Sequence, residues 1–244
     1  SGSGEYIFTH GSVDLYRVDL DTMETTRIAP SDGIAKRWVV SNDGAVLAHS
    51  EYLQQEGKWR LYAGANRSKA VLERADPQGK IRVMGLGRSP GTVLVADDSG
   101  EKDLAEEVSI EDGGRHELFG TLTVRHFLHD RDSNQLIGAT TQEEPGATFF
   151  DPLLLARFKV ARKAFPGLNF ELVSFSRNLE WMIVRTDGKA DSGTYWLVDI
   201  GSAKARAIAR PYRLVKSADV GETRRFAYAA GDGLPIDAIL TLPP

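Results

Sequence analysis

The sequence contains no cysteine among its 244 residues, which excludes disulfides and thiolate metal sites. It has no run of about 18 apolar residues, the length that a membrane-spanning helix needs, so we expect no membrane span. The formal net charge is only −4, and no basic face indicates a nucleic-acid partner. The compartment is left undecided, since any targeting signal of a longer parent protein would lie upstream.

The composition that is present is that of a globular domain. Hydrophobic residues make up 41% and charged residues 26% of the chain, so a substantial core can form. The length fits one large domain or two small ones. Residues 1–4, Ser-Gly-Ser-Gly, have neither the charged nor the apolar part of a signal peptide and are typical of a linker or a cloning scar.

A repeat of about 45 residues runs through the chain. The stretch Leu15–Asp19 matches Tyr195–Asp199 without a gap, at an offset of 180 residues, which is four times 45. The same offset aligns Val18, Asp19, Ile28 and Ala29 with Val198, Asp199, Ile208 and Ala209.

Four strand–turn–strand units fill the interval, and they read RWVVSNDGAVLAHS, IRVMGLGRSPGTVLVA, RHFLHDRDSNQLIGAT and LVSFSRNLEWMIVRT. Their turns centre on Gly44, Gly91, Asn134 and Leu179. Two further short strands follow three of the units, such as Trp59–Ala63 with Val71–Glu73 and Thr194–Ile200 with Ala205–Ala209. Four short strands in 40 to 50 residues is the period of a β-propeller blade. A β-sandwich whose hairpins recur by chance is the alternative, and the ungapped match favours the propeller.

One segment departs from the strand pattern. Asp151 is placed as an N-cap and Pro152 as the first residue of a helix, and the run ends at Pro166-Gly167. Leu154, Phe158, Ala161 and Phe165 would share one apolar face. We therefore predict a single sizeable helix within 151–165, inserted in the third complete blade.

The predicted fold is thus all-β, a partial β-propeller with about four complete four-stranded blades after an incomplete first blade. The incomplete blade would hold strands at Tyr6–Thr9, Leu15–Asp19 and Thr26–Ile28. The first strands of the four complete blades, those nearest the propeller axis, would carry Trp38, Val83, Phe127 and Phe175.

The segment Gly87–Gly91 matches G-x-S-x-G, the nucleophile elbow of α/β-hydrolases, with Ser89 as the nucleophile. An elbow leads into a helix, whereas this turn leads into a further strand. The residue after the nucleophile must also donate its backbone N–H to the oxyanion, and Pro90 has none. We interpret the motif as a hairpin turn, which argues against an autonomous hydrolase built on Ser89.

The other candidate sites are weak. The spacing Gly85-x-Gly87 does not open a helix, as a phosphate-binding loop does. A metal site at His126 and His129 is also weak, because residues three apart on a strand point to opposite faces. Asp187, Asp191 and Ser192 lack calcium-loop spacing and fit a turn. Glu143-Glu144-Pro145 is a candidate for binding an amine or simply an exposed loop, and Asn66-Arg67-Ser68 is a glycosylation sequon. The sequence assigns no catalytic, cofactor-binding or metal-binding residue.

The ending RRFAYAAGDGLPIDAILTLPP resembles the junction at which the propeller of prolyl oligopeptidase family serine peptidases passes into an α/β-hydrolase domain. The matching residues are Tyr228, Asp232, Gly233, Ile236, Leu240 and Pro243, and Pro235 departs from the pattern. The segments FFDPLLLARFKVARKAFPG and TYWLVDI resemble bacterial dipeptidyl- and acylaminoacyl-peptidase-like members. The resemblance covers most of residues 125–244.

The resemblance implies that residues 5–217 are a propeller fragment, and that 218–244 are the junction and first hairpin of a hydrolase domain. The family's catalytic triad lies in that domain, beyond Pro244, and maps onto no residue here. The whole enzyme would cleave short peptides through an acyl-serine intermediate, with the propeller as a non-catalytic filter. The implied partners are this C-terminal hydrolase domain and short peptides, with a homo-oligomer possible. A free-standing propeller that binds a protein or ligand is the alternative.

The terminal hairpin raises a further expectation. A lone two-stranded hairpin is only marginally stable, and its free edges invite pairing. We expect Arg224–Leu242 to add a strand to the first blade near Tyr6–Asp19, or to pair with a second copy.

Overall fold

The computed structural model describes residues 13–31, 34–68, 70–100, 103–188 and 191–243. The linker expected at residues 1–4 and the strand expected at Tyr6–Thr9 lie outside these ranges. The chain divides into two compact units, residues 1–137 and 138–244. Among the described residues, no helix is both long and apolar enough to cross a membrane.

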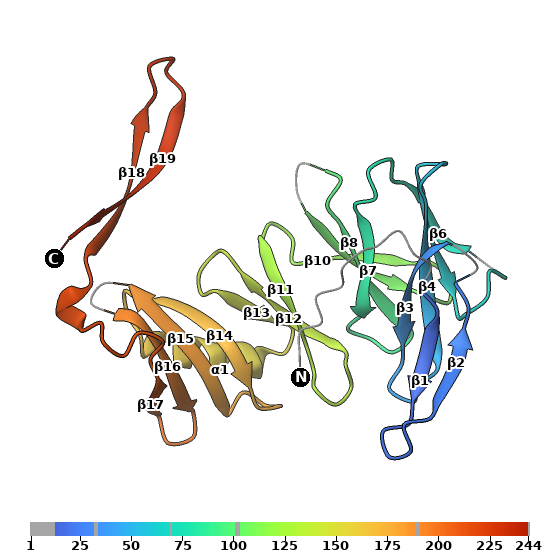
Figure 1. Ribbon diagram of the computed structural model, residues 1–244, viewed down its shortest axis with the longest axis horizontal. Helices are drawn as coiled ribbons and strands as arrows, with labels where there is room; N and C mark the ends of the chain where they lie inside the picture. The colour runs from blue at the N-terminus through green and yellow to red at the C-terminus, as the bar shows by residue number, and fades with distance from the viewer. Residues whose placement is uncertain (1–12, 32–33, 69, 101–102, 189–190, 244) are drawn as a thin grey trace. The chain divides into compact units, whose positions relative to one another are not determined.

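Antiparallel sheets make up most of the first unit (Figure 1). A two-stranded sheet is followed by two four-stranded ones, in which neighbouring strands follow chain order. The strands are β1 (Leu15–Val18) and β2 (Thr25–Ala29); β3 (Ala35–Val40), β4 (Val46–Leu53), β5 (Lys58–Ala63) and β6 (Ala70–Ala75); β7 (Ile81–Leu86), β8 (Thr92–Asp97), β9 (Leu104–Ser109) and β10 (Arg115–Leu118); then β11 (Val124–His129).

The second unit continues the series with one interruption. The sheet β11-β12-β13 has three strands, and a helix follows it. A third four-stranded sheet and a two-stranded one come next. The elements are β12 (Leu136–Thr141), β13 (Ala147–Phe149), α1 (Pro152–Lys163), β14 (Asn169–Phe175), β15 (Trp181–Gly188), β16 (Asp191–Asp199), β17 (Lys204–Ala209), the short 3₁₀ helix η1 (Ser217–Asp219), β18 (Glu222–Ala229) and β19 (Pro235–Leu242).

This architecture confirms the predicted fold class, an all-β propeller built of antiparallel blades. We expected about four complete four-stranded blades, and the described residues form three, together with one three-stranded sheet. In that sheet α1 follows β13, at the place where the other blades have a fourth strand. The helix itself is confirmed. Asp151 is its N-cap, and its Oδ1 accepts a hydrogen bond of 2.7 Å from the Leu153 amide.

The two segments that match at an offset of 180 residues also pair in the same strand register. Leu15 pairs with Ala29 and Val18 with Thr25 in β1–β2. In β16–β17 the pairs at the same offset are Tyr195 with Ala209 and Val198 with Ala205, and the register shift falls at the same step in both. The strands β1 and β2 are therefore equivalent to the third and fourth strands of a blade.

The four turns identified in the sequence share one conformation. Gly44, Gly91, Asn134 and Leu179 all have positive φ, between 53° and 83°. Glycine and asparagine adopt this left-handed region at little cost, whereas leucine does so under strain. The fully buried side chain of Leu179 holds that residue in place. The repeat is thus visible in the backbone even where the residue type changes.

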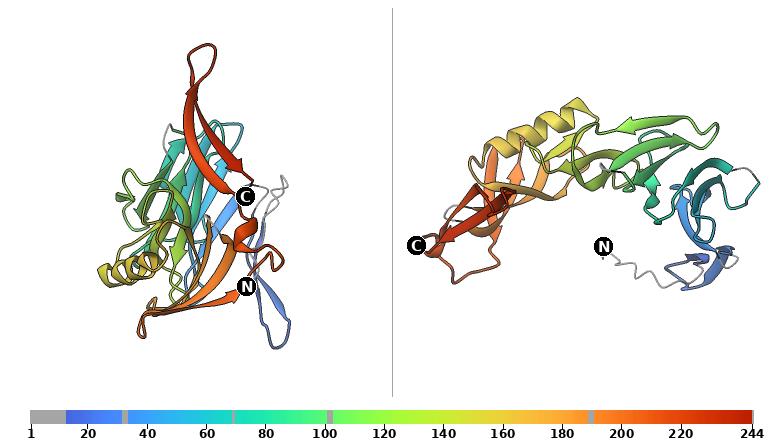
Figure 2. Two further views of the ribbon diagram at one scale, coloured as in Figure 1. Left: turned by 90° about the vertical axis from the view of Figure 1, so that its left-hand side faces the viewer. Right: turned by 90° about the horizontal axis from the view of Figure 1, so that it is seen from above.

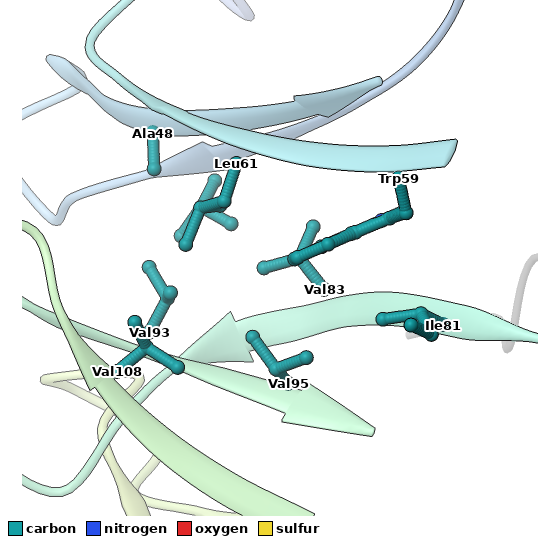
Figure 3. Close-up of a cluster of buried hydrophobic side chains, with 9 residues drawn as sticks. Ala48, Trp59, Leu61, Ile81, Val83, Val93, Val95 and Val108 are labelled. Carbon is teal, nitrogen blue, oxygen red and sulfur yellow. The ribbon is translucent and has the colours of Figure 1, made fainter. Parts of the chain in front are cut away.

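A single apolar cluster joins the sheets β3–β6 and β7–β10 (Figure 3). Trp59 and Leu61 of β5 are at most 1% exposed and face Val83 and Val95 of the neighbouring sheet. Burial of this kind contributes roughly 1.5–3 kcal/mol per large side chain. The other members of the cluster are Val39, Ala48, Ile81, Val93 and Val108.

In the second unit, α1 lies along the sheet β14–β17 (Figure 2). Phe158 of α1 lies edge-on to Phe170 of β14, with ring centroids 5.7 Å apart. Phe165, just after the helix, contacts Trp196 of β16 at 5.3 Å. The apolar face predicted for the helix is therefore its buried face, as the buried Phe158 and Ala161 show.

The residues predicted for first strands lie on them. Trp38, Val83, Phe127 and Phe175 belong to β3, β7, β11 and β14, each of which opens its blade. The strands β3 and β7 lie beside each other. The distance of these residues from a propeller axis stays a prediction.

The register match provides a matched pair for a stability test. Val198 is 4% exposed, whereas the equivalent Val18 is 45% exposed. We expect Val198→Ala to lower the free energy of unfolding by about 1.5–3 kcal/mol, because it removes buried apolar area. We expect Val18→Ala to change it by less than about 0.5 kcal/mol. Urea denaturation of the two variants measures the difference, and equal effects would contradict the assigned burial.

Candidate functional site

The hairpin β18–β19 presents two chemically different faces. Residues directly opposite in an antiparallel pair point to the same side. Phe226 lies opposite Ala238, Tyr228 opposite Ile236, and Arg224 opposite Leu240. The face that carries these six residues and Leu242 is mostly apolar.

The other face is mixed, because it carries polar residues together with Ile239, which is 66% exposed. Thr223 lies opposite Thr241, with 3.2 Å between the two hydroxyl oxygens, and Ala227 lies opposite Asp237. On the apolar face, Phe226, Tyr228, Leu240 and Leu242 are each between 41% and 49% exposed. An amphipathic hairpin with a half-exposed apolar face is typical of a segment that packs against a further element. Figure 1 shows its two strands extending as a hairpin of their own.

The junction motif has a structural explanation in this hairpin. Asp232 Oδ1 accepts the Leu234 amide at 3.1 Å, and Gly233 has φ 84°, a conformation that suits glycine. Tyr228 and Ile236 are cross-strand partners on the apolar face. In the described part of the chain β18 and β19 pair only with each other. The first-blade strand expected at Tyr6–Thr9 lies outside the described residues, so the expected pairing of the hairpin with the first blade, or with a second copy, stays a prediction.

The Ser89 turn is held by a carboxylate. Glu107 Oε1 accepts the Ser89 backbone N–H at 2.8 Å and the Thr92 hydroxyl at 2.7 Å. The turn joins β7 directly to β8, and no helix follows it. A Cβ on Gly87 would lie 2.2 Å from Thr92 Oγ1, so this glycine is required by packing. The turn has the geometry of a blade hairpin and no strand-to-helix elbow.

Asp191, the first residue of β16, is held by hydrogen bonds within its own sheet. Asp191 accepts from the Thr186 hydroxyl at 2.7 Å, the Thr194 hydroxyl at 2.8 Å and the Gly193 amide at 3.0 Å. Trp196 Nε1 in turn donates to Thr186 Oγ1 at 2.8 Å. Burial alone would raise the pKa of Asp191, but these hydrogen bonds outweigh it and lower the pKa below its ordinary value of 3.8. The turn predicted to hold Asp187, Asp191 and Ser192 is shorter than expected, because Asp187 lies in β15 and Asp191 and Ser192 in β16, while the residues that connect the two strands lie outside the described ranges.

The remaining candidates lie apart from one another. Arg162 of α1 forms a two-pronged ion pair with Glu144, which lowers the pKa of that carboxyl and occupies both of its oxygens. Asn66 is exposed in the β5–β6 connection. His126 and His129 both lie on β11. Within the described residues, no three His, Asp or Glu side chains gather as a metal site would require.

The sequence reasoning missed a buried polar cluster on β4. His49 and Glu51 are at most 1% exposed, and the His49 ring lies between Trp38 and Tyr62, with ring centroids 5.1 and 5.0 Å away. His49 Nδ1 lies 2.7 Å from the Gly64 carbonyl oxygen, and Glu51 Oε1 accepts from Arg67 Nε at 2.7 Å. These bonds tie the β5–β6 connection to β4. The one available signal was a histidine and a glutamate two residues apart in a mostly apolar strand.

No protein-family model and no curated protein matches this sequence. Among solved structures, the chain resembles a putative dipeptidyl aminopeptidase IV from Bacteroides ovatus, with a TM-score of 0.51 and 12% identity over 94% of this chain and 37% of that one. It resembles an oligogalacturonate lyase solved with manganese equally well, with a TM-score of 0.51 and 12% identity over 95% of this chain and 72% of that one.

A prolyl endopeptidase also matches, with a TM-score of 0.49 and 9% identity over 96% of this chain and 43% of that one. This chain therefore spans about two fifths of the length of the peptidase chains that it matches. At these identities the likenesses to the dipeptidyl aminopeptidase and the lyase show the propeller fold alone.

The lowered pKa of Asp191 gives a pH-dependent prediction. An ionised Asp191 contributes stability that is fully present above its unfolded pKa, near 3.8, and is lost as the pH falls through the lower folded value. We expect Asp191→Asn to be less stable than the wild type at pH 7, with the gap narrowing below about pH 4. Thermal melts from pH 7 to pH 2.5 measure this gap, and a gap that widens on acidification would contradict the assignment.

Proposed function

We propose that this chain is the non-catalytic β-propeller domain of a prolyl oligopeptidase family serine peptidase. The observation that carries the proposal is the amphipathic hairpin β18–β19, which follows the last propeller blade and has the spacing of the family's junction segment. The propeller fold and the partial coverage of the peptidase chains support it.

In this proposal the residues divide at the junction. Residues 5–217 form the propeller and 218–244 belong to the α/β-hydrolase domain of the parent protein. The apolar face of the hairpin packs against further strands of that domain. The serine, aspartate and histidine of the triad lie there, so no residue of the described chain performs the chemistry.

The propeller in this proposal limits which substrates reach the catalytic serine. A rigid stack of blades admits short or unfolded peptides and excludes folded proteins. Hydrogen bonds of buried side chains within the described blades, such as those of Glu51 to Arg67 and of His49 to the Gly64 carbonyl, favour a rigid wall. The parent enzyme then hydrolyses short peptides through an acyl-serine intermediate.

The alternative is a free-standing propeller that binds a partner or ligand. One observation favours it, namely that the chain covers 72% of the oligogalacturonate lyase it resembles, against 37% of the dipeptidyl aminopeptidase. The apolar face of the hairpin argues against it, because a self-contained propeller has no use for a half-exposed apolar hairpin.

Reactivity with a fluorophosphonate tests the proposal. We expect residues 1–244 alone to show no labelling and no hydrolysis of chromogenic esters or peptides, because the triad is absent and Pro90 cannot donate to an oxyanion. The full-length parent should be labelled and should cleave short peptides but not folded proteins. Labelling of residues 1–244 that disappears in Ser89→Ala would refute the first part, and an unlabelled parent would refute the second.

The two faces of the hairpin provide a second test in the parent. Phe226→Ser and Leu240→Ser alter the apolar face, and Ile239→Ser, at a residue 66% exposed on the opposite face, is the matched control. We expect the first two to lower the melting temperature of the full-length protein, because they leave a buried interface with a hydroxyl in place of an apolar group. In residues 1–244 alone all three should change stability by less than about 0.5 kcal/mol. Identical effects of all three in the parent would exclude the apolar face as the interface.

A further inference from the structure

The imidazole of His129 lies at the contact between β11 and the sheet β7–β10. A Cβ placed on Gly85 of β7 would lie 3.5 Å from His129 Nε2, so the ring covers a position that has no side chain of its own. The pairing of β7 with β8 shifts register between Val83 and Gly85, directly beside this position. The ring therefore packs against an irregular point of β7.

The ring nitrogen at this contact has no hydrogen-bond partner. His129 Nε2 is buried, and none of the described residues bonds to it. In a neutral imidazole one nitrogen carries no proton, so Nε2 needs no acceptor in that tautomer. An imidazolium carries an N–H at both nitrogens, and the one at Nε2 would be buried here without an acceptor. The contact therefore accommodates the neutral ring and disfavours the charged one.

The pKa of this ring is shifted in the direction that the contact requires. Burial lowers the pKa of His129 below its ordinary value of 6.5, so the ring is neutral at pH 7. The contact therefore contributes stability that is fully present above the unfolded pKa, near 6.5. This stability is lost as the pH falls from there through the lower folded value.

A cavity of about 450 Å³ borders the same ring, between the sheet β7–β10 and β11. Arg82 is bound to Asp98, whereas Asp103 and Glu117 have no ion-pair partner among the described residues. A charged His129 that turns into the cavity would meet water and these two carboxylates, which favour its charge. The titratable and charged groups that lie around His129 are Arg82 of β7, Asp98 and Asp103 of the β8–β9 connection, Glu117 of β10, Arg125 and His126 of β11, and Asp130, the next residue of the chain.

We propose that protonation of His129 opens the contact between β11 and the sheet β7–β10, which makes this contact a pH-sensitive device within the propeller. The charged ring leaves its position over Gly85 and turns into the cavity, toward Asp103 and Glu117. The other face of the sheet β7–β10 stays packed against Trp59, so the loosening is local. The device uses no residue of the junction hairpin, and it stands or falls independently of the proposed peptidase role.

Hydrogen exchange of the backbone amides in residues 1–244 tests this device. Exchange is measured at about pH 7.5 and about pH 5 and is corrected for the intrinsic effect of pH on the exchange rate. We expect the protection of β11 to fall at least about threefold at the lower pH, because each unit of pKa shift changes the equilibrium about tenfold. The strands β15 and β16 are the internal reference, since residues 138–244 contain no histidine, and their protection should stay constant.

Two histidines on one strand provide matched variants. His129→Gln removes the titrating group from the contact, so we expect the protection of β11 to be the same at both pH values. His126→Gln alters an exposed residue of the same strand and should keep the pH dependence of the wild type. If His129→Gln does not fold, His129→Phe replaces it, because phenylalanine also binds no proton. Asp103→Asn combined with Glu117→Gln should move the loosening to lower pH, because the charged ring then lacks its carboxylates.

Three results would overturn the proposal. The first is a protection of β11 in the wild type that does not fall at the lower pH. The second is a pH dependence that survives in both His129→Gln and His129→Phe. The third is an equal loss of protection in β15 and β16, which would indicate unfolding of the whole chain rather than a local device.

Discussion

A four-stranded sheet has two faces, and a blade cannot cover both of them by itself. Every other feature of this chain follows from how each face is covered. For β7–β10, Trp59 of the neighbouring sheet covers one face and excludes water from it. On the opposite face Leu94 is fully buried, whereas Arg82, Ala96 and Ala105 border a cavity of about 450 Å³. The sheet β7–β10 therefore has one tightly packed face and one face that partly borders a cavity.

The same constraint explains the two-stranded sheets. The pair β1–β2 repeats the register of β16–β17, yet Val18 is exposed where Val198 is buried. The strand β16 lies inside a four-stranded sheet, whereas β1 pairs only with β2 in the described residues. The hairpin β18–β19 has a comparable apolar face with no covering strand in the described residues. Sequence equivalence fixes how two strands pair, whereas burial depends on what packs against them.

Local chemistry made much of the fold predictable. Several features depend only on residues close together in the chain, so they can be recognised in a single sequence. They are the turns at Gly44 and Gly91, the N-cap at Asp151 and the hairpin turn at Gly233. The missing fourth strand of the third blade was not predicted, because nothing local distinguishes an inserted helix from a helix in place of a strand.

Contacts between distant residues account for what the sequence did not reveal. His49 is buried because Trp38 and Tyr62 enclose its ring, and these lie 11 and 13 residues away on neighbouring strands. Ala96 and Ala105, which both line the cavity beside β7–β10, are partners across two strands, and an alanine in one strand gives no sign of an alanine beside it in the next. Neither feature has a motif, since each depends on register.

The fold alone does not identify the function of this protein. A peptidase and a lyase resemble this chain equally in TM-score and identity, so these likenesses show the fold alone. The G-x-S-x-G match does not identify the function either, because Glu107 and Pro90 make that segment a hairpin turn. What distinguishes the possibilities is a segment whose physical properties fit one of them better. The half-exposed apolar face of β18–β19 is such a segment, and in the proposed function it packs against the hydrolase domain.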